Sequence, residues 1–324
     1  MTPPPSSRLR RLGALAAAAA AAALLLAGCS APAAGNDSSA AATRTVSTAE
    51  GSVTVPTHPK RVVSIHSWTT ESLYDLGVKP VAVEDSGEQY VPTRYLDEWK
   101  PADKVVTGGT VDYEKIAALK PDLIVGVDVP YLKDAYKKLS AIAPTAFAPF
   151  SETATWQDYP KYTADFVGAD AKLATLKSSY DSAIDDTKKE YADQLASVKW
   201  DVIQGGFDDG NYWIYSTSSP VGDVLTQLGA QFASATKDTK AGGNTSVSYE
   251  RTDLLQDADQ LIYYTNNDGS PANNIDKLFA LAGYKDLRAV KAGHVVGTAD
   301  FLPGSYSDAM GLLDDIRSAL KKQS

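Results

Sequence analysis

Residues 171–196 read AKLATLKSSYDSAIDDTKKEYADQLA. Large apolar and aromatic residues recur there at steps of three and four, charged residues stand between them, and neither Gly nor Pro interrupts. This pattern predicts a single amphipathic helix over 171–196, about 39 Å long, with Asp170 as its N-cap. Such a helix is too long for an ordinary crossover in a small sheet, so we expect it to join two lobes.

Short β-rich runs alternate with helical stretches on both sides of this helix. The runs are 61–65, 80–83, 122–125 and 145–147 before it, and 200–203, 212–215, 260–264 and 294–297 after it. A final helix is expected over about 307–321. Alternation of this kind is typical of parallel sheets covered on both faces. The predicted fold class is therefore α/β, with two Rossmann-like lobes of parallel sheet joined by one long rigid helix.

The N-terminus predicts export. Arg8, Arg10 and Arg11 precede the small-apolar run 12–27, which is short for a membrane-spanning helix and ends in Leu-Ala-Gly-Cys. This ending resembles the lipobox of bacterial lipoproteins, and Cys29 is the single cysteine of the chain. We expect an extracytoplasmic protein held at the cell membrane by a lipid on Cys29; the alternative is an ordinary signal peptide with an incidental cysteine.

These signals divide the chain into five parts. We expect a leader over 1–28, a flexible tether over 29–56, an N-terminal lobe over 57–169, the joining helix over 170–197 and a C-terminal lobe over 198–324. The tether is predicted from its Ala, Ser, Thr and Gly content, which leaves little apolar surface to bury.

Charge argues against nucleic acid as a partner. The whole chain carries a net charge of −9, and the leader holds three arginines and no acidic residue, so the remainder is three units more negative. A chain this acidic repels nucleic acid and anionic lipid. No second run of 18 apolar residues is present, so we expect no further membrane span.

A local pattern occurs once in each lobe. Asp112-Tyr113-Glu114 precedes a helix and then Asp122, and Ser248-Tyr249-Glu250 precedes a shorter helix and then Asp259. Each glutamate is expected in a first helical turn, after a residue that can cap it. A carboxylate there complements the helix dipole by about 0.3–1 kcal/mol, which would explain either residue alone. The matched pair suggests a shared task, although pseudo-symmetry could also produce it.

Three phrases carry a resemblance to a known family. Residues 59–64 with 71–83, residues 114–124 (EKIAALKPDLI) and residues 289–295 (AVKAGHV) resemble the iron-siderophore and vitamin B12 periplasmic-binding domain. The resemblance covers about 57–321. It implies two lobes on one rigid helix with little hinge motion, and delivery of the ligand to the permease and ATPase of an ABC importer. In that family one glutamate on each lobe pairs with permease arginines, and Glu114 and Glu250 fall at the matching positions.

Ligands of open α/β sheets bind beyond the carboxyl ends of the strands. The loops expected there are rich in aromatic and amide groups, and their charges are acidic; the nearest basic residues, Arg94, Lys237 and Lys240, could all lie outside. Such a cleft favours a neutral or cationic ferric hydroxamate of the ferrioxamine kind over a triply anionic catecholate. The expected ligand-binding residues are His66, Trp68, Tyr90, Tyr131, Trp156, Trp213, Tyr249 and Phe301, whereas Trp99 and Trp200 are expected to be structural.

Other functions fit the sequence less well. A zinc or manganese receptor needs several convergent ligands, and only His58, His66 and His294 are available. No nucleophile motif or phosphate loop is present, so we expect no enzyme, no catalytic or metal residue and no cofactor, ferric iron entering only within the siderophore. Haem, with Tyr131 or Tyr249 as axial ligand, cobalamin, and a purely structural cell-surface lipoprotein remain alternatives. A monomer is expected.

Overall fold

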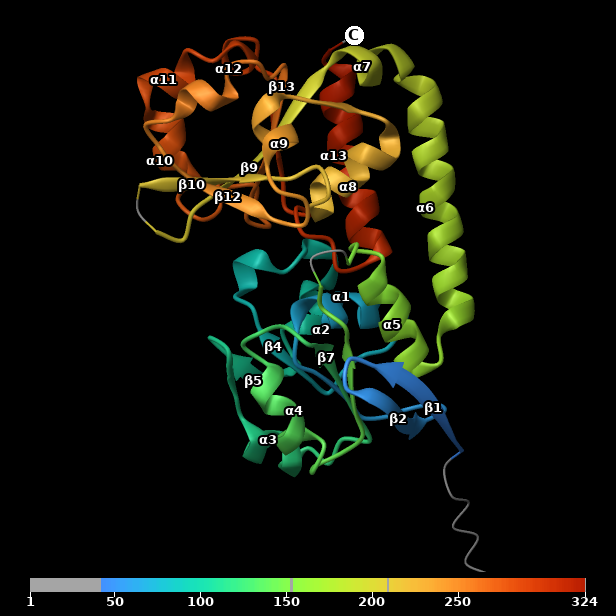
Figure 1. Ribbon diagram of the computed structural model, residues 1–324. Coiled ribbons are helices and arrows are strands. Elements are labelled where there is room, and N and C mark those ends of the chain that lie inside the picture. The colour runs from blue at the N-terminus through green and yellow to red at the C-terminus, as the bar shows by residue number, and fades with distance from the viewer. Residues whose placement is uncertain (1–41, 152–153, 209, 324) are drawn as a thin grey trace, which may run out of the picture. The chain divides into compact units, whose positions relative to one another are not determined.

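The structure is a computed structural model that describes residues 42–151, 154–208 and 210–323 (Figure 1). These residues belong to one unit, Ala41–Ser324. It contains a two-stranded sheet and two six-stranded sheets, one in each half of the chain. The predicted leader, Cys29 and the first part of the predicted tether lie outside the described residues.

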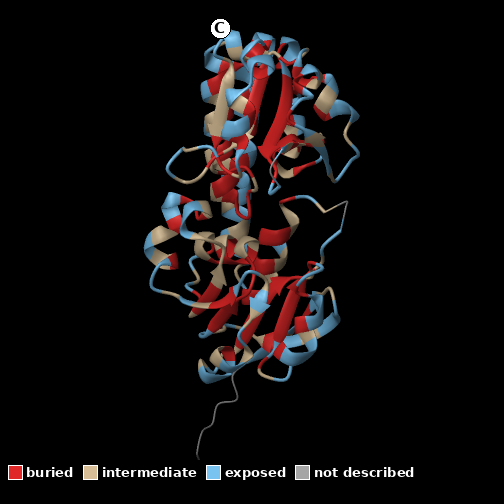
Figure 2. Ribbon diagram, turned by 90° about the vertical axis from the view of Figure 1, so that its left-hand side faces the viewer, coloured by how far each residue is buried: buried red, intermediate tan, exposed pale blue. Residues whose placement is uncertain are grey.

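The N-terminal lobe is built on a sheet of strand order β6-β5-β4-β3-β7-β8. All neighbours are parallel except β6, which is antiparallel to β5. The strands are β3 (Val62–Ser64), β4 (Ala82–Asp85), β5 (Asp103–Thr107), β6 (Thr110–Val111), β7 (Leu123–Val127) and β8 (Thr145–Ala148). The predicted strands at 61–65, 80–83, 122–125 and 145–147 are thus confirmed, with ends shifted by one or two residues. Residues of β3 and β7 are wholly buried, as central parallel strands require (Figure 2).

Short helices connect these strands and cover the sheet. They are α1 (Ser67–Asp75), α2 (Leu96–Trp99), α3 (Tyr113–Ala118), α4 (Tyr136–Leu139) and α5 (Asp158–Val167), with 3₁₀ turns at Glu88–Tyr90, Thr93–Tyr95 and Lys133–Ala135. Helix α1 packs against α5 and against β7, so it lies over the centre of the sheet. The loop between β3 and α1 is therefore held at the carboxyl end of the central strand.

The tether predicted over 29–56 is wrong for its second half. Strands β1 (Thr43–Thr48) and β2 (Gly51–Pro56) form an antiparallel hairpin. Val46 and Val55 are buried in the N-terminal core, and the amide of Ala49 donates to the carbonyl of Phe147 at 2.8 Å. Composition concealed this hairpin because Ser and Thr dominate it, while valines at alternate positions supply enough apolar surface to hold it.

The joining helix is shorter than predicted. Helix α6 covers Asp170–Glu190, and a separate helix α7 covers Ala192–Ser197. The backbone turns at Tyr191, where φ is −118°, and this turn keeps both Tyr191 and Leu195 in the C-terminal core. Asp170 lies in the first turn rather than at the N-cap, which is Ala169. Over about 31 Å, α6 runs along both lobes (Figure 1).

Helix α6 contributes to the cores of both lobes. Leu173 and Leu176 pack against the N-terminal core and also against the C-terminal core, whereas Tyr180 and Ile184 belong to the C-terminal core. The helix contacts α5 of the first lobe and α8 and α13 of the second. It is therefore a joining helix, as the periodicity predicted.

The C-terminal lobe holds a mixed sheet rather than the predicted parallel one. Its order is β12-β10-β9-β13-β14, with β11 also pairing β9. The strands are β9 (Lys199–Gly205), β10 (Asn211–Tyr215), β11 (Gln231–Phe232), β12 (Asn244–Ser248), β13 (Gln260–Tyr264) and β14 (Val295–Thr298). Strand β10 is antiparallel to both β9 and β12. The link from β9 to β10 is too short for the crossover that parallel strands need.

The remaining helices follow the C-terminal strands. They are α8 (Pro220–Leu228), α9 (Ser234–Asp238), α10 (Ile275–Ala280), α11 (Ala282–Lys285), α12 (Arg288–Lys291) and α13 (Tyr306–Lys321), with a 3₁₀ turn at Thr252–Leu255. Helix α13 confirms the predicted final helix. Within the described part of the chain, no helix combines the length and the apolar character needed to cross a bilayer.

The repeated sequence pattern corresponds to a repeated contact. The carboxylate of Asp122 accepts from the amides of Lys60 and Arg61 at 2.7 and 2.9 Å, where the chain enters β3. The carboxylate of Asp259 accepts from the amide of Lys199 at 3.1 Å, at the start of β9. Each aspartate thus fixes the entry of its lobe's central strand, which supports pseudo-symmetry between the lobes.

Candidate ligand-binding site between the two lobes

The loop after β3 places an aromatic side chain between the lobes. His66 is the N-cap of α1, and its Nδ1 accepts from the amide of Trp68 at 3.2 Å. Burial lowers the pKa of His66 to about 3, so the ring is neutral and can act as this acceptor. The rings of His66 and Trp68 lie 4.7 Å apart. His66 therefore positions Trp68 and brings no positive charge to the site.

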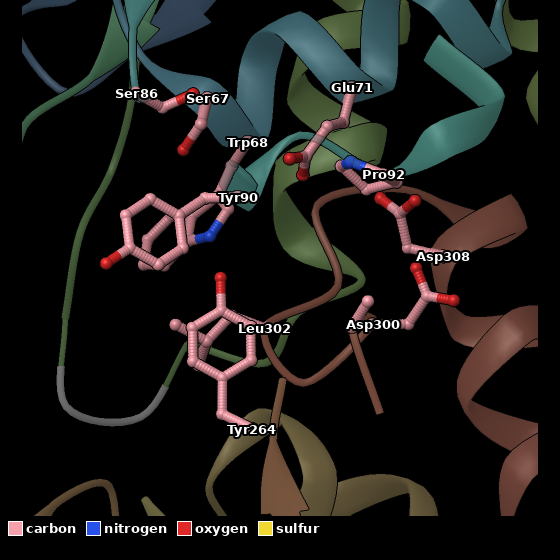
Figure 3. A pocket seen from close by; sticks show the side chains of 11 residues that line it. Ser67, Trp68, Glu71, Ser86, Tyr90, Pro92, Tyr264, Asp300, Leu302 and Asp308 are labelled. Carbon is pink, nitrogen blue, oxygen red and sulfur yellow. The ribbon is translucent and has the colours of Figure 1, made fainter. Parts of the chain in front are cut away.

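An acidic cavity of about 80 Å³ lies next to Trp68 (Figure 3). Both lobes contribute to it, through α1 and the 86–92 segment on one side and through β13, the 299–302 segment and α13 on the other. Its lining is Ser67, Trp68, Glu71, Ser86, Tyr90, Pro92, Tyr264, Ala299, Asp300, Leu302 and Asp308. Three carboxyl groups and three aromatic rings thus face one small space.

A second, aromatic cavity of about 260 Å³ shares Trp68 and Leu302 with the first. Trp68 stacks there on Tyr159, with ring centroids 4.5 Å apart, and lies 6.4 Å from the ring of Phe150. Its lining is Trp68, Phe150, Ser151, Ala154, Trp156, Tyr159, Tyr215, Ser218, Ser219, Pro220, Gly242, Gly243, Asn244 and Leu302. No charged side chain is among these residues, so this cavity offers rings, hydroxyls and amides.

Among the described residues, the arginine close to the acidic cavity is already paired. Arg94, which the sequence analysis allowed to lie outside, joins the lobes instead: its Nη1 and Nη2 donate to the two carboxylate oxygens of Asp300, both at 2.6 Å. Nη1 also donates to Asp308. Asp300 and Asp308 are almost wholly buried, with side-chain exposures of 9% and 1%. Two carboxylates therefore offset the guanidinium charge, and it is not available to an anionic ligand.

Burial and mutual repulsion shift the titration of the cavity carboxyls. Burial, with help from Asp300, raises the pKa of Asp308 to about 7, although Arg94 opposes the rise. Burial and the neighbouring Asp308 and Asp300 raise the pKa of Glu71 well above its usual range. These carboxyls consequently favour protonation, or a cation in their midst.

Direct hydrogen bonds also connect the lobes at the side of the acidic cavity. The Asn267 side chain donates to the carbonyls of Glu88 and Val91 at 2.7 and 3.0 Å. The hydroxyl of Tyr90 donates to Asn273 Oδ1 at 3.0 Å. Together with α6, these contacts connect the two lobes directly.

The structure brings part of the predicted binding set together. Trp68 and Tyr90 line the acidic cavity, and Trp68 also lines the aromatic one. Trp156 reaches the aromatic cavity but is 1% exposed, packed edge-on against Tyr180 and Tyr306. Trp68 is thus the residue around which the site is organised.

Other predicted residues lie apart from both cavities. Tyr131 is half exposed, and its hydroxyl donates to Glu84 Oε1 at 3.5 Å. Phe301 is fully buried between Tyr215 and Tyr264, so it supports the site from behind. The prediction that Phe301 contacts the ligand is therefore wrong.

Trp213 and Tyr249 pack against the cores of the C-terminal lobe. Trp213 packs edge-on against the exposed ring of Phe207, at 5.1 Å, and neither cavity includes it. Tyr249 is buried and its hydroxyl donates to the carbonyl of Asn274 at 2.9 Å, an arrangement that does not suit an axial haem ligand. Trp99 and Trp200 are buried in cores, as expected for structural residues.

Several residues that line the cavities were not predicted from the sequence. Glu71 lies one helical turn after Ser67, so its position in α1 could have placed it beside Trp68. Tyr264 ends the predicted strand 260–264, which is where the carboxyl-end rule expects ligand contacts. Asp308 carried no local signal, because it reaches the cavity only through the way α13 packs against α1.

The two glutamates expected at the permease are both exposed. Glu114 lies in the first turn of α3, where Asp112 caps the helix by accepting from the amide of Lys115 at 2.9 Å. Glu250 lies in a turn before the 3₁₀ helix rather than within it, and its amide donates to Ser248 Oγ at 3.3 Å. The placement expected for Glu250 in a first helical turn is therefore wrong, and its exposure is compatible with docking.

Across the described residues, no group of three or more His, Cys, Asp or Glu side chains is arranged to hold a metal ion. Glu71, Asp300 and Asp308 share one cavity, but two of them are bound to Arg94.

Comparison with known proteins identifies the type of protein. The model of a family described as periplasmic binding protein matches residues 62–300. The chain is 32% identical over 292 residues to the probable siderophore-binding lipoprotein YfiY of Bacillus subtilis, covering 86% of this chain and 88% of that one. It is 25% identical to the iron(3+)-hydroxamate-binding protein YxeB of the same organism, covering 78% and 76%.

A solved structure shows the same fold. It is the siderophore periplasmic binding protein from the fuscachelin gene cluster of Thermobifida fusca, with a TM-score of 0.70 and 26% identity, covering 82% of this chain and 98% of that one. The relatives are binding proteins, so this chain is a binding protein and not an enzyme.

Proposed function

Because the chain belongs to the periplasmic binding protein family, we propose that it is the substrate-binding lipoprotein of an ABC importer and binds a ferric hydroxamate siderophore of the ferrioxamine kind. The siderophore delivers ferric iron as cargo, and the protein needs no cofactor of its own. The ligand would lie between the lobes against Trp68.

The choice of a hydroxamate rests on the lining of the two cavities, where the described residues include no unpaired cation. Among the described lining residues there is no Lys, Arg or His, and Arg94 is held by Asp300 and Asp308. A ferric tris-catecholate carries three negative charges, and burying them beside three carboxyls without a partner would be costly. A ferric tris-hydroxamate is neutral at its centre and avoids that cost.

The aromatic cavity supports the same ligand. Trp68, Phe150 and Tyr159 offer apolar ring surface for the hydrocarbon segments between hydroxamate groups. Ser218 and Asn244 line the cavity from the C-terminal lobe and offer donors for the hydroxamate oxygens. Binding would then rest on ring contacts and neutral hydrogen bonds.

The partners follow from the family. We propose that a lipid on Cys29 anchors the protein outside the cell membrane, since the relatives YfiY and others of its kind are lipoproteins. We further propose that Glu114 and Glu250, one exposed on each lobe, dock the permease of the importer. We expect the protein to act as a monomer.

A fluorescence titration tests the ligand. Tryptophan emission is followed as the purified protein is titrated with ferrioxamine E, a ferric tris-catecholate, haem or cobalamin. We expect saturable quenching by the hydroxamate with a Kd below about 1 μM, equivalent to about −8 kcal/mol. Tight binding of the catecholate with none of the hydroxamate would refute the proposed ligand while leaving the family assignment intact. Tight binding of haem or cobalamin alone would support those ligands instead.

A further inference from the structure

The acidic cavity differs in character from the aromatic cavity beside it. We propose that it binds a protonated amine at one end of the ligand, while the iron centre occupies the aromatic cavity. This inference rests on the proposed function and makes it more specific: the preferred ligand would be a cationic hydroxamate with a free amino group rather than a neutral one.

Glu71 has one carboxyl oxygen that no donor reaches in the described part of the chain. Its carboxyl lines the acidic cavity, and its Oε2 is buried with no hydrogen-bond partner among the described residues (Figure 3). Burial, and after it the carboxyl of Asp308 from the other lobe, raises the pKa of Glu71. Two carboxylates cannot bond to each other unless one holds a proton. An ammonium group would supply the missing donor and remove the repulsion at the same time.

Arg94 does not fill this need. Its Nη1 donates to Asp300 and Asp308 and its Nη2 to Asp300, so the guanidinium is turned to the C-terminal lobe. Glu71, Asp300 and Asp308 bring three potential negative charges, and the arginine brings one positive charge. With all three carboxyls ionised, the cavity would hold more negative than positive charge, which a cation can offset and an anion cannot.

The opposite wall of the acidic cavity is aromatic. Trp68, Tyr90 and Tyr264 line it, and the rings of Tyr90 and Tyr264 stack at 6.0 Å. Aromatic faces attract ammonium groups, more strongly when water is excluded. Carboxyls on one side and aromatic rings on the other are the combination that suits an alkylammonium ion, and in the described residues no cluster suits a bare metal ion.

The volumes of the two cavities indicate which part of the ligand each one can hold. The acidic cavity, at about 80 Å³, has room for a few water-sized groups and not for a tris-hydroxamate chelate. The aromatic cavity is larger, at about 260 Å³, and shares Trp68 and Leu302 with it. A chelate in the larger cavity could thus extend one amine-bearing chain past Trp68 into the smaller one.

The test compares two ligands that differ at one nitrogen. Ferrioxamine B ends in a protonated primary amine, and its N-acetyl derivative has the same iron centre without that charge. Both are titrated by tryptophan quenching against the wild-type protein, Glu71→Gln and Glu88→Gln. Glu88 is a matched control: it lies in the same 86–92 segment, but its exposed carboxylate pairs with Lys100 and lines neither cavity.

We expect the wild-type protein to bind ferrioxamine B at least about tenfold more tightly than the N-acetyl derivative, as for a hydrogen bond between charged groups. Glu71→Gln should bind the two ligands with equal affinity, and this remaining binding shows that the variant is folded. Glu88→Gln should keep the preference.

Three results would overturn the inference. Equal affinity of the wild-type protein for both ligands would refute the amine site and leave the proposed function standing, and this comparison needs no variant. A preference that survives in Glu71→Gln would remove Glu71 from the site. Failure of both ligands to bind would refute the inference together with the proposed hydroxamate ligand.

Discussion

Replacing Arg94 with methionine should destabilise the folded protein strongly at high pH. The substitution keeps much of the side-chain volume but leaves Asp300 and Asp308 without their shared cation. Removing one partner of a buried ion pair costs about 3–5 kcal/mol. Arg94 is itself about one-third exposed, at 32%, so we expect the lower end of this range, about 3 kcal/mol.

The loss should depend on pH because the stranded carboxyls can take up protons. The pKa of Asp308 is raised to about 7, above its value in an unfolded chain of about 3.9, so the folded state binds more protons between these values. The contribution of Asp308 to the free energy of unfolding is therefore greatest at low pH and falls as the pH rises toward 7. Without Arg94 the folded pKa rises further, so the loss is larger at pH 8 than at pH 5.

Urea unfolding followed by fluorescence at pH 5 and pH 8 measures this effect. Arg251→Met is the matched control: Arg251 also grips both oxygens of one aspartate, Asp253, but the pair is exposed and we expect no measurable change. The reasoning is refuted if Arg94→Met is as stable as the wild-type protein at pH 8, or if its loss is the same at both pH values.

Three further predictions concern binding and delivery. Trp68→Ala should weaken ferric hydroxamate binding by about tenfold or more in a fluorescence or calorimetric titration, because Trp68 lines both cavities; an unchanged Kd would contradict its central place. Replacing Glu114 and Glu250 together by alanine should abolish uptake of labelled ferric siderophore by cells and leave the Kd intact, so normal uptake would reduce them to surface charges. Cys29→Ala should release the protein from the membrane fraction or leave it unprocessed, and unchanged anchoring would argue against the lipid.

The sequence predicted the features that depend on local pattern. A parallel sheet is covered on both faces, so its central strands are continuous apolar runs such as 122–125. Strand β7, which is buried throughout, confirms this prediction. The position of Trp68 followed from the rule that ligands bind at carboxyl ends of strands. Both conclusions need only neighbouring residues and a general rule of packing.

Features that depend on distant contacts could not be predicted in the same way. Arg94 and Asp300 are 206 positions apart, and nothing near either residue indicates that they meet. Phe301 and Tyr264 are both aromatic residues beside predicted loops, yet one is buried and the other lines a cavity. No Gly or Pro marks the turn at Tyr191. Tyr191 and Leu195 both pack in the C-terminal core there, and this packing involves residues distant in the sequence.

Amide hydrogen exchange with and without a bound ferric hydroxamate tests the position of the ligand most directly. If the ligand lies between the lobes against Trp68, protection should increase together in segments 66–71, 154–159 and 299–304, which come from both lobes, while β1 and β2 stay unchanged. Protection confined to one lobe, or absent from 66–71 and 299–304 although the ligand is bound, would contradict the account.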